Sequence, residues 1–243
     1  MKILITTDWY KPVINGVVTS VTNLEEGLRG AGHDVRILTL SNDLHSYRKE
    51  NVTFIGSIGV GVIYPNARLR ARLNDPLVQE LIDWKPDVVH SQCEFSTFSF
   101  AKRIAHESGC PLIHTYHASV VIAHCPEFLH YFSPNVRLGH FLARKFSHYI
   151  ASQTDAVIVP TEKIRNMLRS YQITQPIRTV PTGLKMGAFL APLPPEKRTV
   201  LRRALGLREG DLALTYIGRL AQEKSIGELL RFLPDTPQNV RLL

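Results

Sequence analysis

The sequence predicts an α/β protein in which a Rossmann-like parallel sheet carries helices on both faces, followed by the beginning of a second domain. Two observations support this fold class. Short apolar runs alternate with helix-length amphipathic segments along all 243 residues. The apolar runs are continuous rather than interrupted at every second residue, which is typical of strands buried on both faces.

The elements follow one another in regular alternation. The apolar runs predict strands over Lys2–Thr7, Asp34–Leu40, Val52–Ile55, Asp87–His90, Leu112–Thr115, Ala156–Val159, Ile177–Val180 and Leu212–Ile217. The amphipathic segments predict helices over Gly16–Ala31, Asn74–Trp84, Ser96–Ser108, Val136–Ser152, Glu162–Tyr171, Glu196–Leu205 and Ser225–Phe232. Ligands of such sheets bind beyond the carboxyl ends of the strands, so we expect site residues in the loops that follow them.

A change in composition predicts the domain boundary. Pro192, Pro194 and Pro195 crowd one segment and exclude a regular helix interior there. We therefore expect a first domain over residues 1–182, a linker over 183–195 and the start of a second domain over 196–243.

Composition and charge narrow the class of partner. The formal net charge of +8 favours anionic partners. The sequence has no zinc-finger spacing, RNP-like motif or long Lys/Arg run, so nucleic acid is not expected. No apolar run approaches the roughly 20 residues that span a bilayer. The N-terminus lacks the shape of a signal peptide and the three cysteines form no CxxC pair, which favours a reduced, cytosolic compartment.

Two early loops offer candidate site residues. Gly16 removes a side chain where the first helix begins, so a ligand could approach the backbone amides; the alternative is an ordinary helix start with a glycine for packing. Glu94 ends another strand and could orient a sugar hydroxyl; the alternative is that it caps the next helix. No GxGxxG fingerprint accompanies these loops, which counts against a nicotinamide or flavin cofactor.

The fifth strand ends in His114-Thr-Tyr-His117. This predicts that His117 lies at the carboxyl end of the strand and faces the cleft in which a ligand would bind. A His-x-x-His pair suggests zinc, but residues three apart in a strand point to opposite faces. We therefore expect no metal, and the remaining alternative for His117 is a histidine held in the core.

Two basic segments suggest contact with an anionic surface. Arg137, Arg144 and Lys145 are interspersed with apolar residues at roughly helical spacing in the segment 135–152. Arg68, Arg70 and Arg72 form a second group. The functional interpretation is docking on an anionic membrane, at about 1 kcal/mol for each basic residue near the lipid. The alternative for the helical segment is a domain helix whose apolar stripe faces the core.

Arg219 and Lys224 flank the start of a helix after Gly218. Two fixed cations beside helix amides suit a diphosphate, and they stabilise charge that develops on a leaving group. The alternative is a solvated surface in which Glu223 pairs with one of the two cations.

These motifs together resemble a known family. Asn15-Gly16-Val-Val, His90-Ser-Gln-Cys-Glu94-Phe, His114-Thr-Tyr-His117, Pro160-Thr-Glu-Lys163, Pro181-Thr-Gly183 and Gly218-Arg219-x4-Lys224 occur in the order found in the retaining glycosyltransferases of family four. Within that family the chain looks most like the bacterial enzymes that glucosylate diacylglycerol.

The resemblance implies a fold and a set of roles. The fold would be GT-B, with a first domain on the acceptor side and a second domain that binds the nucleotide sugar. His117 and Glu94 would act at the reacting centre. Gly16, Thr161, Glu162, Arg219 and Lys224 would lie on the donor side. The family is metal-independent, so neither a metal nor another cofactor is expected. The family's later Glu-x7-Glu motif does not follow Lys224, so we expect little turnover from this chain alone.

The predicted function is transfer of a hexose, as in UDP-glucose-dependent enzymes, from a nucleotide sugar to a membrane-surface acceptor such as diacylglycerol. The expected location is the cytoplasmic side of the membrane, as a peripheral protein. A non-catalytic module that binds a lipid or a partner is one alternative. An epimerase that acts on a nucleotide sugar is another, because it would share the fold.

Overall fold

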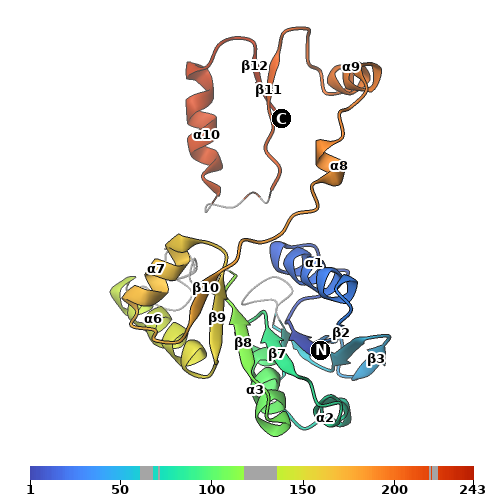
Figure 1. The fold of residues 1–243 in the computed structure, drawn as a ribbon. Coiled ribbons are helices and arrows are strands. Elements are labelled where there is room, and N and C mark those ends of the chain that lie inside the picture. Colours follow the sequence, from blue (N-terminus) through green and yellow to red (C-terminus); the bar gives the residue numbers. More distant parts are fainter. Residues whose placement is uncertain (61–67, 71, 118–135, 219, 221–223) are drawn as a thin grey trace. The chain divides into compact units, whose positions relative to one another are not determined.

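The computed structural model describes residues 1–60, 68–70, 72–117, 136–218, 220 and 224–243. They divide into two compact units, Met1–Leu184 and Lys185–Leu243, each of which is considered by itself (Figure 1).

The first unit is built on an eight-stranded sheet whose order is β10-β9-β8-β7-β1-β2-β4-β3. The strands are β1 (Lys2–Thr6), β2 (Asp34–Leu40), β3 (Tyr47–Lys49), β4 (Val52–Ile55), β7 (Val88–Ser91), β8 (Leu112–Thr115), β9 (Ala156–Val159) and β10 (Ile177–Thr179). All neighbours are parallel except β3, which pairs antiparallel with β4 at the edge. The predicted parallel sheet is confirmed. The prediction missed β3 because its three exposed residues contain no apolar run.

Five described helices accompany this sheet. They are α1 (Gly16–Gly30), α2 (Pro76–Asp83), α3 (Ser96–Ser108), α6 (Val136–Ser152) and α7 (Glu162–Ser170). Polar side chains fix several starts: Asn15 Oδ1 accepts from Val18 N at 2.8 Å, and Asp75 Oδ1 accepts from Leu77 N at 3.1 Å. Gly109, with φ of 67°, ends α3 in the left-handed conformation that glycine adopts without strain.

Alternate residues of β1 enter two separate cores. Ile3 and Ile5 pack with Val21 of α1 in the smaller core. Leu4 belongs to the larger core, to which α2, α3, α6 and α7 contribute. Because successive residues of a strand point to opposite faces, the two cores lie on opposite sides of the sheet. The prediction of helices on both faces is confirmed.

A small hairpin follows β4. Strand β5 (Ile58–Gly59) pairs antiparallel with β6 (Arg68–Leu69). Gly56 precedes the hairpin, and a methyl group at this position would overlap the backbone carbonyl group of Leu44. The close approach of these two backbone segments therefore requires glycine.

The second unit begins with α8 (Gly187–Leu190) and α9 (Pro195–Ala204). Strand β11 (Leu212–Leu214) pairs in parallel with β12 (Val240–Leu242), and α10 (Ile226–Phe232) and a 3₁₀ helix (Leu233–Asp235) lie between them in sequence. The short helix α8 forms inside the predicted linker, just before its prolines begin at Pro192.

Candidate functional site

Polar side chains collect where β1, β7 and β8 end. These strands are neighbours in the sheet, and Thr7–Asp8, Gln92–Glu94 and His117 follow them. The carboxyl ends of parallel strands meet at one edge, so this edge is where a Rossmann-like sheet binds ligands. We call Asp8, Gln92, Glu94 and His117 the polar cluster.

His117 is held by Gln92. Its Nε2 atom lies 2.6 Å from Gln92 Oε1, and the side chain is half-buried. Burial lowers the pKa of His117 to about 4, although the nearby Glu94 carboxylate acts in the opposite direction and His114 lowers the pKa further. The imidazole is therefore neutral near pH 7, and it can hydrogen-bond a hydroxyl group without adding positive charge.

His114, three residues earlier, lies in the core. It is fully buried, with its ring edge-on to Phe98 at 5.5 Å and to Tyr116 at 5.0 Å between centroids. Its Nε2 atom lies 3.6 Å from Glu94 Oε1. The core-histidine alternative thus describes His114 rather than His117.

A different acid, Asp8, makes the contact at the helix start that the capping alternative assigned to Glu94. Helix α3 follows Glu94, and its Thr97 amide donates to Asp8 Oδ1 at 2.9 Å, across 89 positions of sequence. Asp8 therefore fills the acceptor position at this helix start. The Glu94 side chain is 9% exposed and its Oε1 atom lies 3.6 Å from His114 Nε2, and its charge raises the pKa of both Asp8 and His117.

Asp8 is a site residue that the sequence reasoning did not single out. It is 6% exposed, and its Oδ2 atom has no hydrogen-bond partner among the described residues. Burial raises the pKa of Asp8 from 3.8 to about 6, against the opposing effect of the Thr97 amide. The signal available in the sequence was an acidic residue placed directly after the first buried strand.

Gly16 and the start of α7 also lie where a loop leads from the end of a sheet strand into a helix. No atom lies within 4 Å of the position where a Cβ of Gly16 would be, so packing among the described residues does not require glycine there. Thr161 Oγ1 accepts from Ile164 N at 3.4 Å, and Glu162 pairs with Arg165 at 3.2 Å. Thr161 and Glu162 thus make the ordinary contacts of a helix start, and their donor role stays a prediction.

The two predicted diphosphate ligands belong to the second unit. Lys224 is exposed and precedes α10 by two residues. Arg219 lies outside the described residues. Their role in binding a diphosphate stays a prediction.

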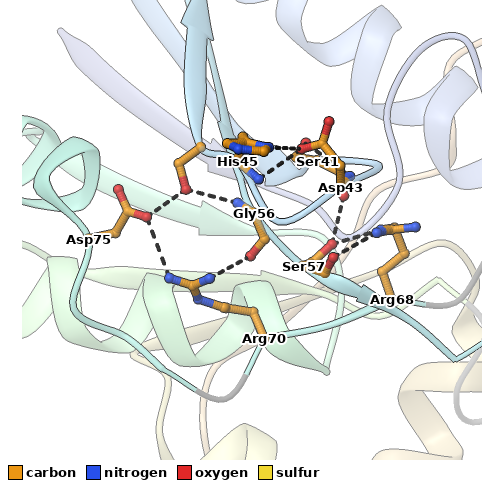
Figure 2. Close-up of polar contacts among 9 residues, drawn as sticks. Ser41, Asp43, His45, Gly56, Ser57, Arg68, Arg70 and Asp75 are labelled. Atoms are coloured by element: carbon orange, nitrogen blue, oxygen red, sulfur yellow. Dashed lines mark hydrogen bonds and ion pairs between the residues drawn. The ribbon is translucent and has the colours of Figure 1, made fainter.

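Arg68 and Arg70 are engaged inside the first unit (Figure 2). Arg68 donates to Ser57 Oγ and to Ser57 O, each at 2.7 Å. Arg70 donates to Gly56 O at 3.0 Å and lies 3.7 Å from Asp75 Oδ2, the acid at the start of α2. These two guanidinium groups tie the end of β4 to the segment before α2, whereas Arg72 is exposed.

Helix α6 presents its apolar residues to the surface. Among the larger apolar side chains at helical spacing that the structure describes in this helix, only Ile150 is buried. The exposed ones are Leu138, Phe141, Leu142, Phe146 and Tyr149. Arg137, Arg144 and Lys145 on the same helix are also exposed. The core-facing alternative therefore holds for one residue of the stripe only.

Neither a bilayer span nor a metal centre is found in the described part of the chain. No described helix combines the length and apolarity that crossing a bilayer requires. No three or more His, Cys, Asp or Glu side chains converge there as metal ligands would.

Two hollows lie away from the polar cluster. One, of about 360 Å³, lies between α6 and α7 and includes His140, Phe141, Arg144 and Tyr171 in its lining. The other, of about 540 Å³, lies beside α1, β3 and β4. Glu25 at its edge already accepts from Tyr10 Oη at 2.6 Å and from Asn51 Nδ2 at 2.7 Å.

Comparisons with known proteins show which family the chain resembles. The family model described as Glycosyltransferase Family 4 matches residues 14–186. The alpha-monoglucosyldiacylglycerol synthase of Streptococcus pneumoniae is 30% identical over 236 residues, which is 95% of this chain and 51% of the relative. The enzyme of the same name from Acholeplasma laidlawii is 30% identical over 242 residues, covering 95% of this chain and 58% of the relative. The chain thus spans somewhat over half the length of these relatives.

Solved structures support the fold. The sucrose-phosphate synthase of Thermosynechococcus elongatus matches with a TM-score of 0.62 at 17% identity, over 99% of this chain and 61% of that one. The lipopolysaccharide outer core galactosyltransferase WaaB matches with a TM-score of 0.56 at 15% identity, over 100% of this chain and 60% of that one. Since the family model covers most of the first unit and both relatives match almost the whole chain, the chain belongs to glycosyltransferase family 4.

Proposed function

We propose that the protein is a retaining glycosyltransferase that moves a hexose, such as the glucose of UDP-glucose, to a diacylglycerol-type lipid at an anionic membrane surface. The observation that carries the proposal is the likeness to two proteins named alpha-monoglucosyldiacylglycerol synthase, each 30% identical across 95% of this chain. The polar cluster and helix α6 supply chemistry that suits such a reaction.

The polar cluster suits a neutral sugar. His117 is uncharged near pH 7 because burial lowers its pKa to about 4, so it exchanges hydrogen bonds with hydroxyl groups rather than neutralising phosphate. Glu94 is the neighbouring acceptor and can orient a second hydroxyl. Holding the hexose in one pose lowers the entropy cost of reaching the transition state.

In the transfer step, the bond between the anomeric carbon and the diphosphate oxygen breaks, and a bond to the acceptor hydroxyl oxygen forms on the same face. The acceptor proton moves to an oxygen of the departing diphosphate. Arg219 and Lys224 would stabilise the negative charge that grows on this leaving group. No metal or other cofactor enters this proposal.

Helix α6 suits the lipid side of the reaction. Its exposed aromatic and aliphatic side chains can enter the acyl boundary, while Arg137, Arg144 and Lys145 attract anionic headgroups. Phe95, adjacent to Glu94 in sequence, stacks on Phe146 of α6 at 6.3 Å between ring centroids. The lipid-facing helix therefore adjoins the polar cluster.

The catalytic part is tested by replacing His117 with alanine in the full-length protein. Transfer of labelled glucose from UDP-glucose to diacylglycerol should fall roughly 100-fold, as expected for loss of a positioned polar group at a reacting centre. The matched control is His106→Ala, which removes an exposed histidine of α3. Equal activity of the two variants, with both folded, would exclude the role of His117.

The membrane part is tested by co-sedimentation with vesicles that contain phosphatidylglycerol. Replacing Arg144 and Lys145 by alanine should weaken binding about 30-fold, because each basic residue near the lipid is worth about 1 kcal/mol. The control Lys197→Ala/Arg198→Ala removes the same charge from exposed positions of α9. Equal loss in both variants would assign the effect to net charge and reject a docking role for α6.

A further inference from the structure

A buried amide connects the sheet to His117. Gln92 directly follows β7 and is 2% exposed. Its backbone amide donates to Thr6 O at 2.8 Å, which continues the pairing of β7 with β1. The central strands of the sheet therefore fix the backbone from which the Gln92 side chain extends.

The contact that Gln92 makes is informative because a carboxamide oxygen accepts hydrogen bonds and never donates them. Gln92 Oε1 lies 2.6 Å from His117 Nε2. A neutral imidazole carries its proton on one nitrogen only, so this contact requires the proton on Nε2. Nδ1 then keeps its lone pair and can accept a hydrogen bond.

The other histidines at this edge lack such a constraint. His90 Nε2 lies 2.7 Å from Thr115 Oγ1, but a hydroxyl group can donate or accept and thus permits either tautomer. Both ring nitrogens of His114 are without a hydrogen-bond partner among the described residues. His117 is therefore the histidine of these three whose proton has a set position.

We propose that Gln92 is a positioning residue: it holds His117 in the tautomer with the proton on Nε2, so that Nδ1 accepts a hydrogen bond from a hydroxyl group of the transferred hexose. The part concerning the hexose rests on the proposed function. Gln92 acts through His117, because its own side chain is buried and ends on the imidazole. Gln92 Nε2 has no hydrogen-bond partner among the described residues. The contact from Gln92 that orients the imidazole ring is therefore made by its amide oxygen.

The test observes the proton directly. Long-range ¹H–¹⁵N correlation spectra of the protein near neutral pH distinguish a protonated from an unprotonated ring nitrogen for each assigned histidine. Wild-type His117 should show a protonated Nε2 and an unprotonated Nδ1. Gln92→Met, which keeps the length of the side chain and removes the acceptor, should populate both tautomers. Gln92→Glu keeps an acceptor against Nε2 and should keep that nitrogen protonated, as in the wild-type protein.

A matched control uses the neighbouring pair. Thr115→Val removes the hydroxyl group beside His90 and should change the His90 signals while leaving those of His117 unchanged. Transfer measured on the same variants should fall roughly tenfold in Gln92→Met, which is the lower end of the loss seen when the hydrogen-bond partner of a metal-binding histidine is removed. Gln92→Glu should recover most of that rate, which a purely structural role would not predict.

The outcomes separate this proposal from the proposed function. A proton on Nδ1 in the wild-type protein, or an unchanged His117 tautomer in folded Gln92→Met, would overturn the role of Gln92. If the tautomer pattern is as expected and wild-type protein transfers no hexose, the placement of the proton is supported and the transferase function is contradicted. If the wild-type protein transfers hexose and Gln92→Met does so at the same rate, the positioning role of Gln92 is contradicted and the transferase function is not.

Discussion

Replacing Asp8 by asparagine should change how the stability of the first unit depends on pH. The carboxyl group is buried at the end of β1, and burial raises its pKa from 3.8 to about 6. Asparagine has nearly the same shape, and its Oδ1 atom can still accept from Thr97 N. The substitution therefore removes a titration while it keeps the contact at the start of α3.

The sign follows from the direction of this pKa. A carboxyl group whose pKa is higher in the folded state binds its proton more tightly there, so folding is favoured at low pH. This contribution is fully present below pH 3.8 and is lost as the pH rises through about 6. Because each pH unit corresponds to about 1.36 kcal/mol, the wild-type protein should lose about 3 kcal/mol relative to Asp8→Asn across this window.

Urea unfolding at a series of pH values, followed by circular dichroism, measures this difference. Any constant effect of the amide on packing cancels, because the prediction concerns only the change with pH. Asp155→Asn is the matched control: Asp155 Oδ2 also accepts a backbone amide, from Leu112 at 2.7 Å, but this residue is exposed. Parallel stability profiles for the wild-type protein and Asp8→Asn between pH 4 and pH 7 would refute the reasoning.

Two further predictions concern the network before α2. Gly56→Ala should lower the free energy of unfolding by about 1–3 kcal/mol, because a methyl group there would overlap the Leu44 carbonyl group. Gly27→Ala, inside α1 with open space around it, should instead leave stability unchanged or raise it by up to about 1 kcal/mol; similar melting temperatures for the two variants would contradict this. Arg70→Ala should cost about 1–3 kcal/mol by leaving its buried partners unpaired, whereas Arg72→Ala should cost little. Thermal unfolding measures the stability of all four variants. An equal loss of stability in Arg70→Ala and Arg72→Ala would show that the contacts of Arg70 do not stabilise the fold.

The sheet could be predicted from sequence because its signal is local. Runs such as Ile3–Ile5 and Val157–Val159 are apolar without interruption, and burial on both faces is what such runs indicate. The rule that ligands bind at the carboxyl ends of strands also placed Glu94 and His117 on one edge of the sheet. Strand β3 could not be found in this way because its three residues are exposed, and Tyr47 meets the Phe54 ring on which it stacks only when the strand pairs with β4.

The partners of polar residues could not be predicted, because they are distant in sequence. Arg68 and Arg70 look like a solvated basic patch until Gly56 O and Ser57 O are seen to accept from them. Asp8 looks like the start of a loop until the Thr97 amide is placed against it. In each case the charge is visible in the sequence, but whether it is hydrated or bound depends on packing.

Helix α6 shows the same limit for apolar residues. Helical spacing predicted the helix correctly, but it could not say whether the stripe faces the core or the solvent. Ile150 is buried and Phe141 is 53% exposed on the same helix. The basic residues between them were the additional signal that favoured a surface role.

The most direct test of the proposed function is a transfer assay with UDP-glucose labelled in the sugar and diacylglycerol in phosphatidylglycerol vesicles, using the full-length protein. We expect the label to appear in a lipid that carries an α-linked hexose, and to disappear from that lipid when vesicles without diacylglycerol are used. Label that stays on the nucleotide, or that is recovered only as an epimerised nucleotide sugar, would contradict a lipid glycosyltransferase.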